Sequence, residues 1–287
     1  MTECPDQKVS VEGSLGVKPH VAVLMACYNR KQKTLEAFNA LTEALTGATF
    51  TVYLVDDGST DGTSEAVTSA FPDTVVIRGD GNLFWAASMC LAERRAMRSH
   101  FDYLLWLNDD THLRPNAIDE MLELSRQQPK AIIVGATVDP ASGQTTYGGR
   151  MRVDSHPQRF SLVAVSDSVQ VVNNFNGNCV LIPASIRQLL GPIDGSFPHA
   201  FADDDYGQRA MTRGVAMLQA PSFVGYCATN PPRPAPAGFV QRWRHYESPK
   251  VLPWRAQYQY MRRHGDATWP VWFAASVVRR MAGQKSK

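Results

Sequence analysis

Short apolar runs that end in acidic residues constrain the fold of this 287-residue chain more than any other feature. Residues 52–55 are followed by an Asp-Asp pair at 56–57, and residues 103–107 by an Asn-Asp-Asp run at 108–110. All-hydrophobic runs of this length are typical of parallel strands that are covered on both faces. In open α/β sheets, ligands bind beyond the carboxyl ends of such strands. The sequence therefore predicts one crevice where both acidic clusters meet, and the gathered carboxylates favour a metal-assisted active site.

Strand and helix patterns alternate along the first half of the chain, as a parallel sheet requires. The expected strands are residues 21–26, 50–55, 74–77, 103–107 and 132–138, and the expected helices are residues 31–45, 63–70, 83–99 and 115–127. Beyond residue 138 we expect short strands at 160–165, 169–173, 179–183, 215–218 and 223–226, with helices at 184–190 and 205–213. The sequence therefore predicts an α/β fold with a Rossmann-like, mostly parallel central sheet flanked by helices and a smaller antiparallel portion.

Three segments are expected along the chain. Residues 1–20 are polar and predict a disordered leader rather than a targeting signal. Residues 21–230 predict the folded α/β domain. A Pro-rich run at 230–236 cannot extend a helix or a central strand, so residues 231–287 predict a linker followed by a helical C-terminal extension.

The C-terminal extension has its own charge and composition. From residue 233 onward, eleven Lys and Arg oppose two acidic residues, which gives +9 against −7 for the rest of the chain. The extension is also aromatic, with Trp243, Tyr246, Trp254, Tyr258, Tyr260, Trp269, Trp272 and Phe273. Aromatic rings mixed with Arg and Lys suit the headgroup layer of an anionic membrane, so we expect a peripheral membrane contact and no nucleic acid. The alternative is that these rings pack the extension onto the domain.

Cysteine usage and hydropathy bear on the compartment. Five cysteines without CxxC spacing argue against a disulfide framework and fit a reducing cytoplasm. No stretch reaches the roughly 18 consecutive apolar residues that a transmembrane helix requires. We therefore expect a cytoplasmic protein, either soluble or peripheral on the inner face of the plasma membrane.

Four motifs follow four of the expected strands in a fixed order. They are Ala-Cys-Tyr-Asn-Arg at 26–30, Val-Asp-Asp-Gly-Ser-Thr-Asp-Gly at 55–62, Gly-Asn at 81–82 and Asn-Asp-Asp at 108–110. In this order the motifs resemble the signature of family 2 glycosyltransferases, over roughly residues 21–230. The resemblance implies a GT-A fold, inversion at the anomeric carbon, a UDP- or dTDP-linked sugar as donor and a divalent metal, Mn²⁺ or Mg²⁺. It also implies a glycan or a lipid-linked saccharide as acceptor, as in surface polysaccharide synthesis.

The first two motifs predict the nucleotide pocket. Asp56, at a strand end, can accept the imide N–H of uracil or thymine, and Asp57 is assigned to the same site. Tyr28 is expected to stack in this pocket and Arg30 to contact phosphate or carboxylate groups. The alternative for the acidic pair is a solvated Asx turn.

The third motif, Gly81 and Asn82, predicts a turn before a helix whose backbone N–H groups approach the donor. The surrounding sequence superficially suggests a dinucleotide-binding loop. However, Phe84 stands where GxGxxG has its last glycine, so a Rossmann dehydrogenase is disfavoured.

The fourth motif stands where the family usually has Asp-x-Asp and predicts the metal site. Asp110 is the leading metal ligand, because a hard divalent cation needs oxygen ligands and bridges the donor diphosphate. Asn108 brings no charge, and Tyr226 stands where many relatives have a His ligand, so we expect weak metal binding. Asp109 is assigned to the donor site; it faces away from Asp110 if the strand pleat persists and inward if the loop turns it. The alternative is that the motif caps the next helix.

A third acidic cluster, Asp203, Asp204 and Asp205, resembles the family's late acidic motif at the start of a helix. The resemblance assigns one carboxylate to removal of the acceptor hydroxyl proton; Asp203 is our choice of general base, with Asp204 beside it in the catalytic group. Asp205 and Arg209 stand at i and i+4 and can pair as a structural support. A Gly-Asn-Cys run at 177–179 resembles the family's acceptor-side loop. The alternative for the cluster is a charged helix N-terminus favoured by the helix dipole.

Two other functions fit parts of the pattern. A nucleotidyltransferase is disfavoured, because no N-terminal loop rich in Lys, Arg and Gly is present to grip a triphosphate. A catalytically weak or inactive binding or scaffold subunit is suggested by Asn108 and Tyr226, whereas Asp56, Asp110 and Asp203 argue against it.

Overall fold

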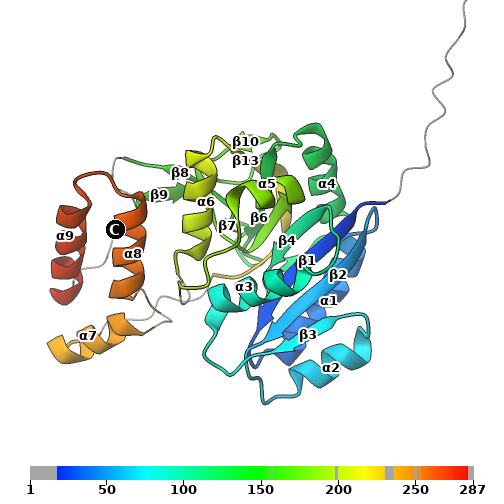
Figure 1. Ribbon diagram of the computed structural model, residues 1–287, viewed down its shortest axis with the longest axis horizontal. Helices are drawn as coiled ribbons and strands as arrows, with labels where there is room; N and C mark the ends of the chain where they lie inside the picture. Colours follow the sequence, from blue (N-terminus) through cyan, green and yellow to red (C-terminus); the bar gives the residue numbers. More distant parts are fainter. Residues whose placement is uncertain are drawn as a thin grey trace, which may run out of the picture.

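The computed structural model describes residues 18–154, 156, 158–197, 200–229, 236–248, 251 and 253–283 (Figure 1). Residues 1–17 of the expected leader and residues 230–235 of the expected linker lie outside this description. One long sheet with helices on both faces forms the body, and three C-terminal helices lie to one side of it (Figure 1).

The first half of the chain alternates strands and helices. Its elements are β1 (His20–Cys27), α1 (Lys31–Ala44), β2 (Thr49–Asp56), α2 (Thr63–Ala70), β3 (Val75–Arg78), α3 (Phe84–Ala96), β4 (Tyr103–Leu107), β5 (His112–Leu113), α4 (Ala117–Gln127) and β6 (Ala131–Val138). Strands β4, β1, β2 and β3 are parallel neighbours in that order. Cys27 lies opposite Asp56, and Asp56 opposite Arg78, so the loops after these strands leave the sheet at one edge.

The second half of the chain adds the antiparallel portion. Its elements are β7 (Thr145–Tyr147), β8 (Gly149–Arg152), β9 (Phe160–Leu162), β10 (Gln170–Val171), β11 (Asn174–Phe175), β12 (Cys179–Pro183), α5 (Ala184–Leu190), α6 (Ala202–Thr212) and β13 (Ala216–Tyr226). Strand β12 runs antiparallel between β4 and β6, and β13 is parallel to β6. Strands β11, β8 and β9 form a small separate sheet. The predicted α/β class, with a mostly parallel central sheet and an antiparallel portion, is confirmed.

Several of the expected boundaries are wrong, and two of the differences bear on the site and on the central sheet. The helix expected at 205–213 begins at Ala202, so all three aspartates of the acidic cluster lie in its first turn. The strands expected at 215–218 and 223–226 are a single strand, β13, because a register shift between Gln219 and Phe223 keeps both parts paired with β6. Strands β5 and β11 were not expected, since a run of two residues has no periodicity to detect.

Side-chain alternation along the strands divides the core into two layers. In β4, Leu104 and Trp106 pack with α3, α5 and α6, whereas Leu105 and Leu107 pack with α1 and α4. Successive side chains of a strand point to opposite faces, and here both faces are covered. This double covering explains why the run 103–107 is uninterrupted by polar residues.

The C-terminal extension contains α7 (Phe239–Glu247), α8 (Trp254–His264) and α9 (Trp269–Met281). Helix α8 packs on α6: Tyr260 is fully buried and stacks on Phe201 with ring centroids 5.0 Å apart. Trp243 of α7 lies 5.7 Å, between ring centroids, from Trp254 of α8. Part of the aromatic content of the extension therefore serves packing. Within the described part of the chain, no helix combines the length and the apolar character needed to cross a bilayer.

Candidate active site

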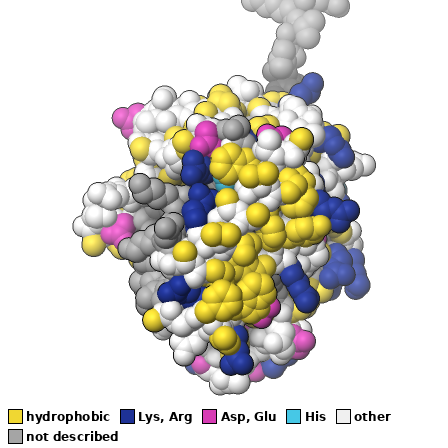
Figure 2. Space-filling view, turned by 90° about the vertical axis from the view of Figure 1, so that its left-hand side faces the viewer, with side chains coloured by type: hydrophobic (Ala, Val, Ile, Leu, Met, Phe, Trp, Pro, Cys, Tyr) yellow, Lys and Arg dark blue, Asp and Glu magenta, His cyan; other side chains and the backbone are white. Residues whose placement is uncertain are grey.

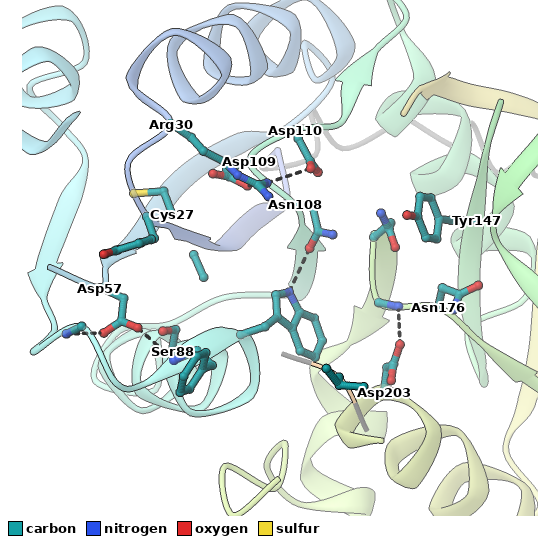
Figure 3. A pocket seen from close by; sticks show the side chains of 18 residues that line it. Cys27, Arg30, Asp57, Ser88, Asn108, Asp109, Asp110, Tyr147, Asn176 and Asp203 are labelled. Atoms are coloured by element: carbon teal, nitrogen blue, oxygen red, sulfur yellow. Dashed lines mark hydrogen bonds and ion pairs between the residues drawn. The ribbon is translucent and has the colours of Figure 1, made fainter. Parts of the chain in front are cut away.

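A cavity of about 910 Å³ opens where the carboxyl ends of β1 and β4 meet the start of α3, the loop before β12 and the first turn of α6 (Figure 3). Of the residues predicted from sequence, its described lining includes Tyr28, Arg30, Asp57, Gly81, Asn108, Asp109, Asp110 and Asp203. That described lining does not include Asp56, Asn82 or Asp204. The structure thus brings all four motifs and one residue of the late acidic cluster to a single cavity.

Arg30 holds the acidic motif that follows β4. Its Nη1 lies 3.1 Å from Asp109 Oδ1 and 2.8 Å from Asp110 Oδ2. Asp109 is 5% exposed, and burial raises its pKa to about 7 although Arg30 opposes the shift. Its Oδ2 has no hydrogen-bond partner among the described residues. Asp109 lines the cavity. Because β4 ends at Leu107, the direction of the Asp109 side chain is set by the turn that follows and not by the strand pleat.

Trp85 joins the cavity wall to the core. Its Nε1–H donates to Asn108 Oδ1 at 2.9 Å, and its ring lies edge-on to Trp106 with centroids 6.0 Å apart. A Cβ on Gly177 would stand 2.6 Å from the Trp85 ring, so the ring needs glycine at this position. With its oxygen turned to the indole, Asn108 is a fixed polar group on the cavity wall.

Asp57 organises the Gly-rich turn before α3. Its carboxylate accepts N–H bonds from Gly81 and Phe84 at 2.9 Å and from Leu83 at 3.2 Å. A Cβ on Gly79 would stand 2.6 Å from Asp57 Oδ1, so this approach also requires glycine. The backbone N–H groups that we expected to face the donor are therefore bonded to Asp57, which satisfies them as a helix N-terminus requires. The side chain of Asp57 stands between this turn and the cavity (Figure 3).

Asp56 is 4% exposed, about as buried as Asp57. Its Oδ1 accepts the Ser59 N–H at 2.8 Å, and its Oδ2 accepts the Ser64 hydroxyl. Asn29 fastens the preceding loop to this one: its N–H donates to Ser59 Oγ, and its Oδ1 accepts the Thr60 N–H, both at 2.8 Å. The acidic pair is therefore a buried loop anchor and not a solvated turn. Sequence reasoning missed Asn29, although Asn tolerates the left-handed backbone that it adopts at φ 49°.

The two predicted catalytic carboxylates point in different directions. Asp203 enters the cavity, where its Oδ2 accepts the Gly177 N–H at 3.1 Å (Figure 3). Asp204 pairs instead with Arg150 at 2.5 Å, and burial raises the pKa of Asp204 to about 6 against the charge of Arg150. Adjacent residues of a helix are rotated by about 100°, and here the rotation turns Asp204 toward β8 while Asp203 lines the cavity. Of the three aspartates in this cluster, only Asp203 belongs to the described lining of the cavity.

The residues present fit a divalent cation in part. Asp109 and Asp110 offer carboxylate oxygens, and the buried Oδ2 of Asp109 is an acceptor that a cation or water would satisfy. Cys227 Sγ lies 3.7 Å from Asp110 Oδ1, next to Tyr226 at the end of β13. Across the described segments, no group of three or more His, Cys, Asp or Glu side chains is placed to hold a metal. A cation here would take its remaining ligands from the donor diphosphate and water, as Mg²⁺ commonly does.

Several residues that line the cavity were missed by the sequence analysis. Tyr147 of β7, Asn176 before β12 and Val251 between α7 and α8 all line the cavity, as does Ser88 of α3. They belong to no shared motif, because folding brings them together from distant segments. Only Asn176 had a sequence signal, since it adjoins the glycine of the expected acceptor-side loop.

Comparison with known proteins agrees with this geometry. Residues 22–189 match the profile described as Glycosyl transferase family 2. The chain is 24% identical over 213 residues to the N-acetylglucosaminyl-diphospho-decaprenol L-rhamnosyltransferase of Mycobacterium tuberculosis, in strains CDC 1551 and H37Rv. That similarity covers 66% of this chain and 69% of the relative.

Two solved structures share the fold. GalNAc-T7 with UDP, GalNAc and Mn²⁺ superposes with a TM-score of 0.60 at 13% identity, over 93% of this chain and 56% of that one. The mannosyltransferase PcManGT from Pyrobaculum calidifontis, in complex with GDP-Man and Mn²⁺, superposes with a TM-score of 0.56 at 16% identity. That superposition covers 94% of this chain and 77% of the mannosyltransferase. These likenesses confirm the predicted GT-A fold. Because the profile covers more than half of its length, the chain belongs to glycosyl transferase family 2, as the order of its motifs predicted.

Proposed function

We propose that the protein is an inverting glycosyltransferase that moves one sugar from a UDP- or dTDP-linked donor to a hydroxyl of a glycan or lipid-linked acceptor. The observation that carries the proposal is the cavity, which has Asp203 on one side and Asn108, Asp109 and Asp110 across from it (Figure 3). Direct displacement needs a base for the acceptor and a site for the leaving diphosphate, and this cavity offers both. Membership of family 2 supports the proposal.

In this mechanism Asp203 accepts the proton of the acceptor hydroxyl as that oxygen attacks the anomeric carbon. The bond from the anomeric carbon to the diphosphate oxygen breaks on the opposite side, so the configuration inverts and no covalent enzyme intermediate forms. The N–H of Gly177 orients the Asp203 carboxylate. Arg30 brings a positive charge to the side where the diphosphate would leave. A divalent cation bound with Asp110 would offset the negative charge of that leaving group.

Donor recognition is assigned to the first two motifs. Tyr28 lines the cavity with 49% of its surface exposed, and we assign its ring to stacking on the nucleobase. Asp57 lines the same cavity, and we assign it the closer contact with the nucleotide. Asp56 already accepts bonds from Ser59 and Ser64 and is not in the described lining of the cavity, so its main role in the proposal is to hold the loop.

We also propose that α7 and α9 contact an anionic lipid surface. Their exposed apolar side chains are Phe239, Val240 and Trp243 on α7 and Val271 and Val278 on α9. Figure 2 shows hydrophobic side chains gathered among Lys and Arg on the side of the molecule where these helices lie. The relative from M. tuberculosis is named for a decaprenol-linked acceptor, and an acceptor of that class would lie at such a surface.

The test is release of nucleoside diphosphate from UDP-glucose, UDP-galactose, UDP-N-acetylglucosamine, dTDP-rhamnose and GDP-mannose, each with Mn²⁺, with Mg²⁺ or with chelator. We expect slow hydrolysis of a UDP- or dTDP-linked donor that is faster with metal. Hydrolysis of GDP-mannose alone would overturn the nucleotide assignment. Donors that bind in calorimetry but are neither hydrolysed nor transferred would favour a catalytically weak or inactive scaffold subunit.

A further inference from the structure

The first turn of α6 is anchored by separate contacts at each of its three aspartates. Asp203 accepts from a loop N–H, Asp204 pairs with Arg150 of β8, and Asp205 pairs with α8. The amide of Asp205 also donates to the carbonyl of Phe201 at 2.7 Å, which closes the backbone turn that contains Asp203. A shift of Asp205 would therefore move the backbone from which Asp203 projects.

Two side chains of helix α8 bind Asp205. Arg263 Nη1 lies 2.6 Å from Asp205 Oδ1, and His264 Nε2 lies 2.8 Å from the same oxygen. Arg209 Nε, within α6, lies 2.8 Å from Oδ2, and the Asp205 side chain is 0% exposed. Burial alone would raise the pKa of Asp205, but the bonds from His264, Arg209 and Arg263 hold it below its ordinary value. Loss of one partner would leave a buried carboxylate charge incompletely compensated.

Helix α8 also contacts the chain just before α6. Phe201 adopts a left-handed backbone, with φ 76°, which is uncommon for a bulky residue and persists only where the surroundings enforce it. Tyr260 of α8 stacks on the Phe201 ring with an interplanar angle of 21°. Nη1 of Arg263 lies 2.8 Å from Asp194, in the segment between α5 and α6. The entry into α6 and its first turn are therefore fastened to the same helix.

We propose that α8 positions the catalytic base: Arg263 and His264 hold Asp205 and thereby fix the turn that directs Asp203 into the cavity. This inference rests on the proposed role of Asp203 as general base. It gives the C-terminal extension a part in catalysis that is separate from any lipid contact. A purely structural role for α8 would lower stability and leave the rate per folded molecule unchanged.

Arg263→Gln tests the proposal, and Arg262→Gln is its matched control, because Arg262 is an exposed cation at the neighbouring position of α8. The probe is whichever of the five nucleotide sugars above the parent protein hydrolyses, with water as acceptor. We expect Arg263→Gln to lower kcat about ten- to a hundredfold, since small misplacement of a catalytic group has effects of this size. The donor KM and the UDP affinity in calorimetry should stay at parental values, and Arg262→Gln should keep the parental kcat.

Conservative variants separate positioning from general damage. Arg263→Lys keeps a cation and should recover most of the rate that Arg263→Gln loses. His264→Gln keeps an N–H donor and should be faster than His264→Ala. Parental kcat in Arg263→Gln would overturn the proposal, and so would a loss of rate accompanied by an equal rise in the donor KM.

Hydrogen exchange of the peptide spanning residues 201–209 provides a readout that does not depend on activity. We expect faster exchange in Arg263→Gln than in the parent or in Arg262→Gln, at a temperature where all three proteins are folded. Unchanged exchange would overturn the proposal. This outcome can be read even if the parent protein hydrolyses no donor.

Asp203→Asn distinguishes failure of this inference from failure of the proposed function. If Asp203→Asn abolishes hydrolysis and Arg263→Gln does not slow it, positioning by α8 is refuted and the base assignment stands. If Asp203→Asn keeps the parental rate, the base assignment itself fails, and with it the catalytic consequence of α8.

Discussion

The two sides of the cavity are held together by different parts of the fold. On the donor side, Asp56 accepts bonds from Ser59 and Ser64, three and eight residues further on. On the acceptor side, Asp205 is held by Arg263, 58 residues further on and in a helix outside the central sheet. The proposed donor side is therefore built from the central sheet and the loops that follow its strands, since Arg30 also pairs with Asp110 of another such loop. The proposed acceptor side also includes contacts with a helix of the C-terminal extension.

The largest effect should come from the acceptor side. Asp203→Asn removes the proposed base, and we expect donor hydrolysis and transfer to fall about 10²- to 10⁴-fold, which is the usual contribution of a general base. UDP affinity in calorimetry should be unchanged, because Asp203 lies across the cavity from the donor motifs. Asp204→Asn is the control. This variant should unfold at a lower urea concentration than the parent, yet retain more of the parental rate than Asp203→Asn does. Equal loss of rate in both variants would contradict a special role for Asp203.

On the proposed donor side, a substitution should affect stability and nucleotide binding. Asp57→Ala leaves the backbone amides of Gly81, Leu83 and Phe84 without their acceptor, so we expect a loss of about 1–3 kcal/mol in unfolding free energy and weaker UDP binding. Urea unfolding and calorimetry measure the two effects. Asp80→Ala is the matched control, since Asp80 accepts only an exposed N–H bond from Asn82. If Asp57→Ala slows hydrolysis at saturating donor while UDP affinity is intact, the division into two sides is wrong.

Substitutions that weaken the proposed lipid contact should leave both sides of the cavity unaffected. The double variant Phe239→Ser, Trp243→Ser should lower binding to phosphatidylglycerol vesicles in co-sedimentation by about tenfold or more, because each exposed ring contributes on the order of 1 kcal/mol when partly buried. UDP affinity should not change. Val171→Ser, which alters an exposed apolar residue of β10, should bind vesicles as the parent does. Equal binding of the parent to neutral phosphatidylcholine vesicles would contradict a preference for anionic lipid.

The smallest effect concerns the pH dependence of the acceptor side. The pKa of Asp205 lies below its ordinary value of 3.8, so its ion pairs contribute stability above that pH and lose it as the pH falls through the lower value. Urea unfolding of the parent and of Asp205→Asn should therefore differ most near neutral pH. The difference should shrink in the most acidic buffers in which both proteins fold. A difference that is constant across this range would show that Asp205 is not held as a carboxylate by α8.

The donor side was largely predictable from sequence because its signals are local. The apolar run 103–107 coincides with β4, and the helix at 63–70 coincides with α2. Turn residues indicated that the acidic motifs follow the ends of strands. In the structure these strand ends lie at one edge of the sheet. What the motifs did not indicate is which of two adjacent carboxylates faces the cavity. Asp57 and not Asp56 does so, because the Asp56 carboxylate is turned toward Ser59 and Ser64.

The acceptor side was less predictable for a physical reason. The run of three aspartates marks a helix start, but the partners of Asp204 and Asp205 come from β8 and from α8. No local pattern relates Arg150 or Arg263 to this turn. Likewise, the sequence could not show that Val251 lines the cavity, since that contact depends on how the C-terminal helices pack.

The late position of Arg263 and His264 in the chain has a consequence for biosynthesis. Chains emerge from the ribosome from the N-terminus at about 5–20 residues per second, and early segments fold first. All four donor-side motifs have been translated by residue 110, long before α8 exists. If α8 aims the base, the nascent protein gains nucleotide binding well before it gains transfer chemistry. A chain terminated ahead of residue 263 would then be a nucleotide-binding competitor of the complete protein.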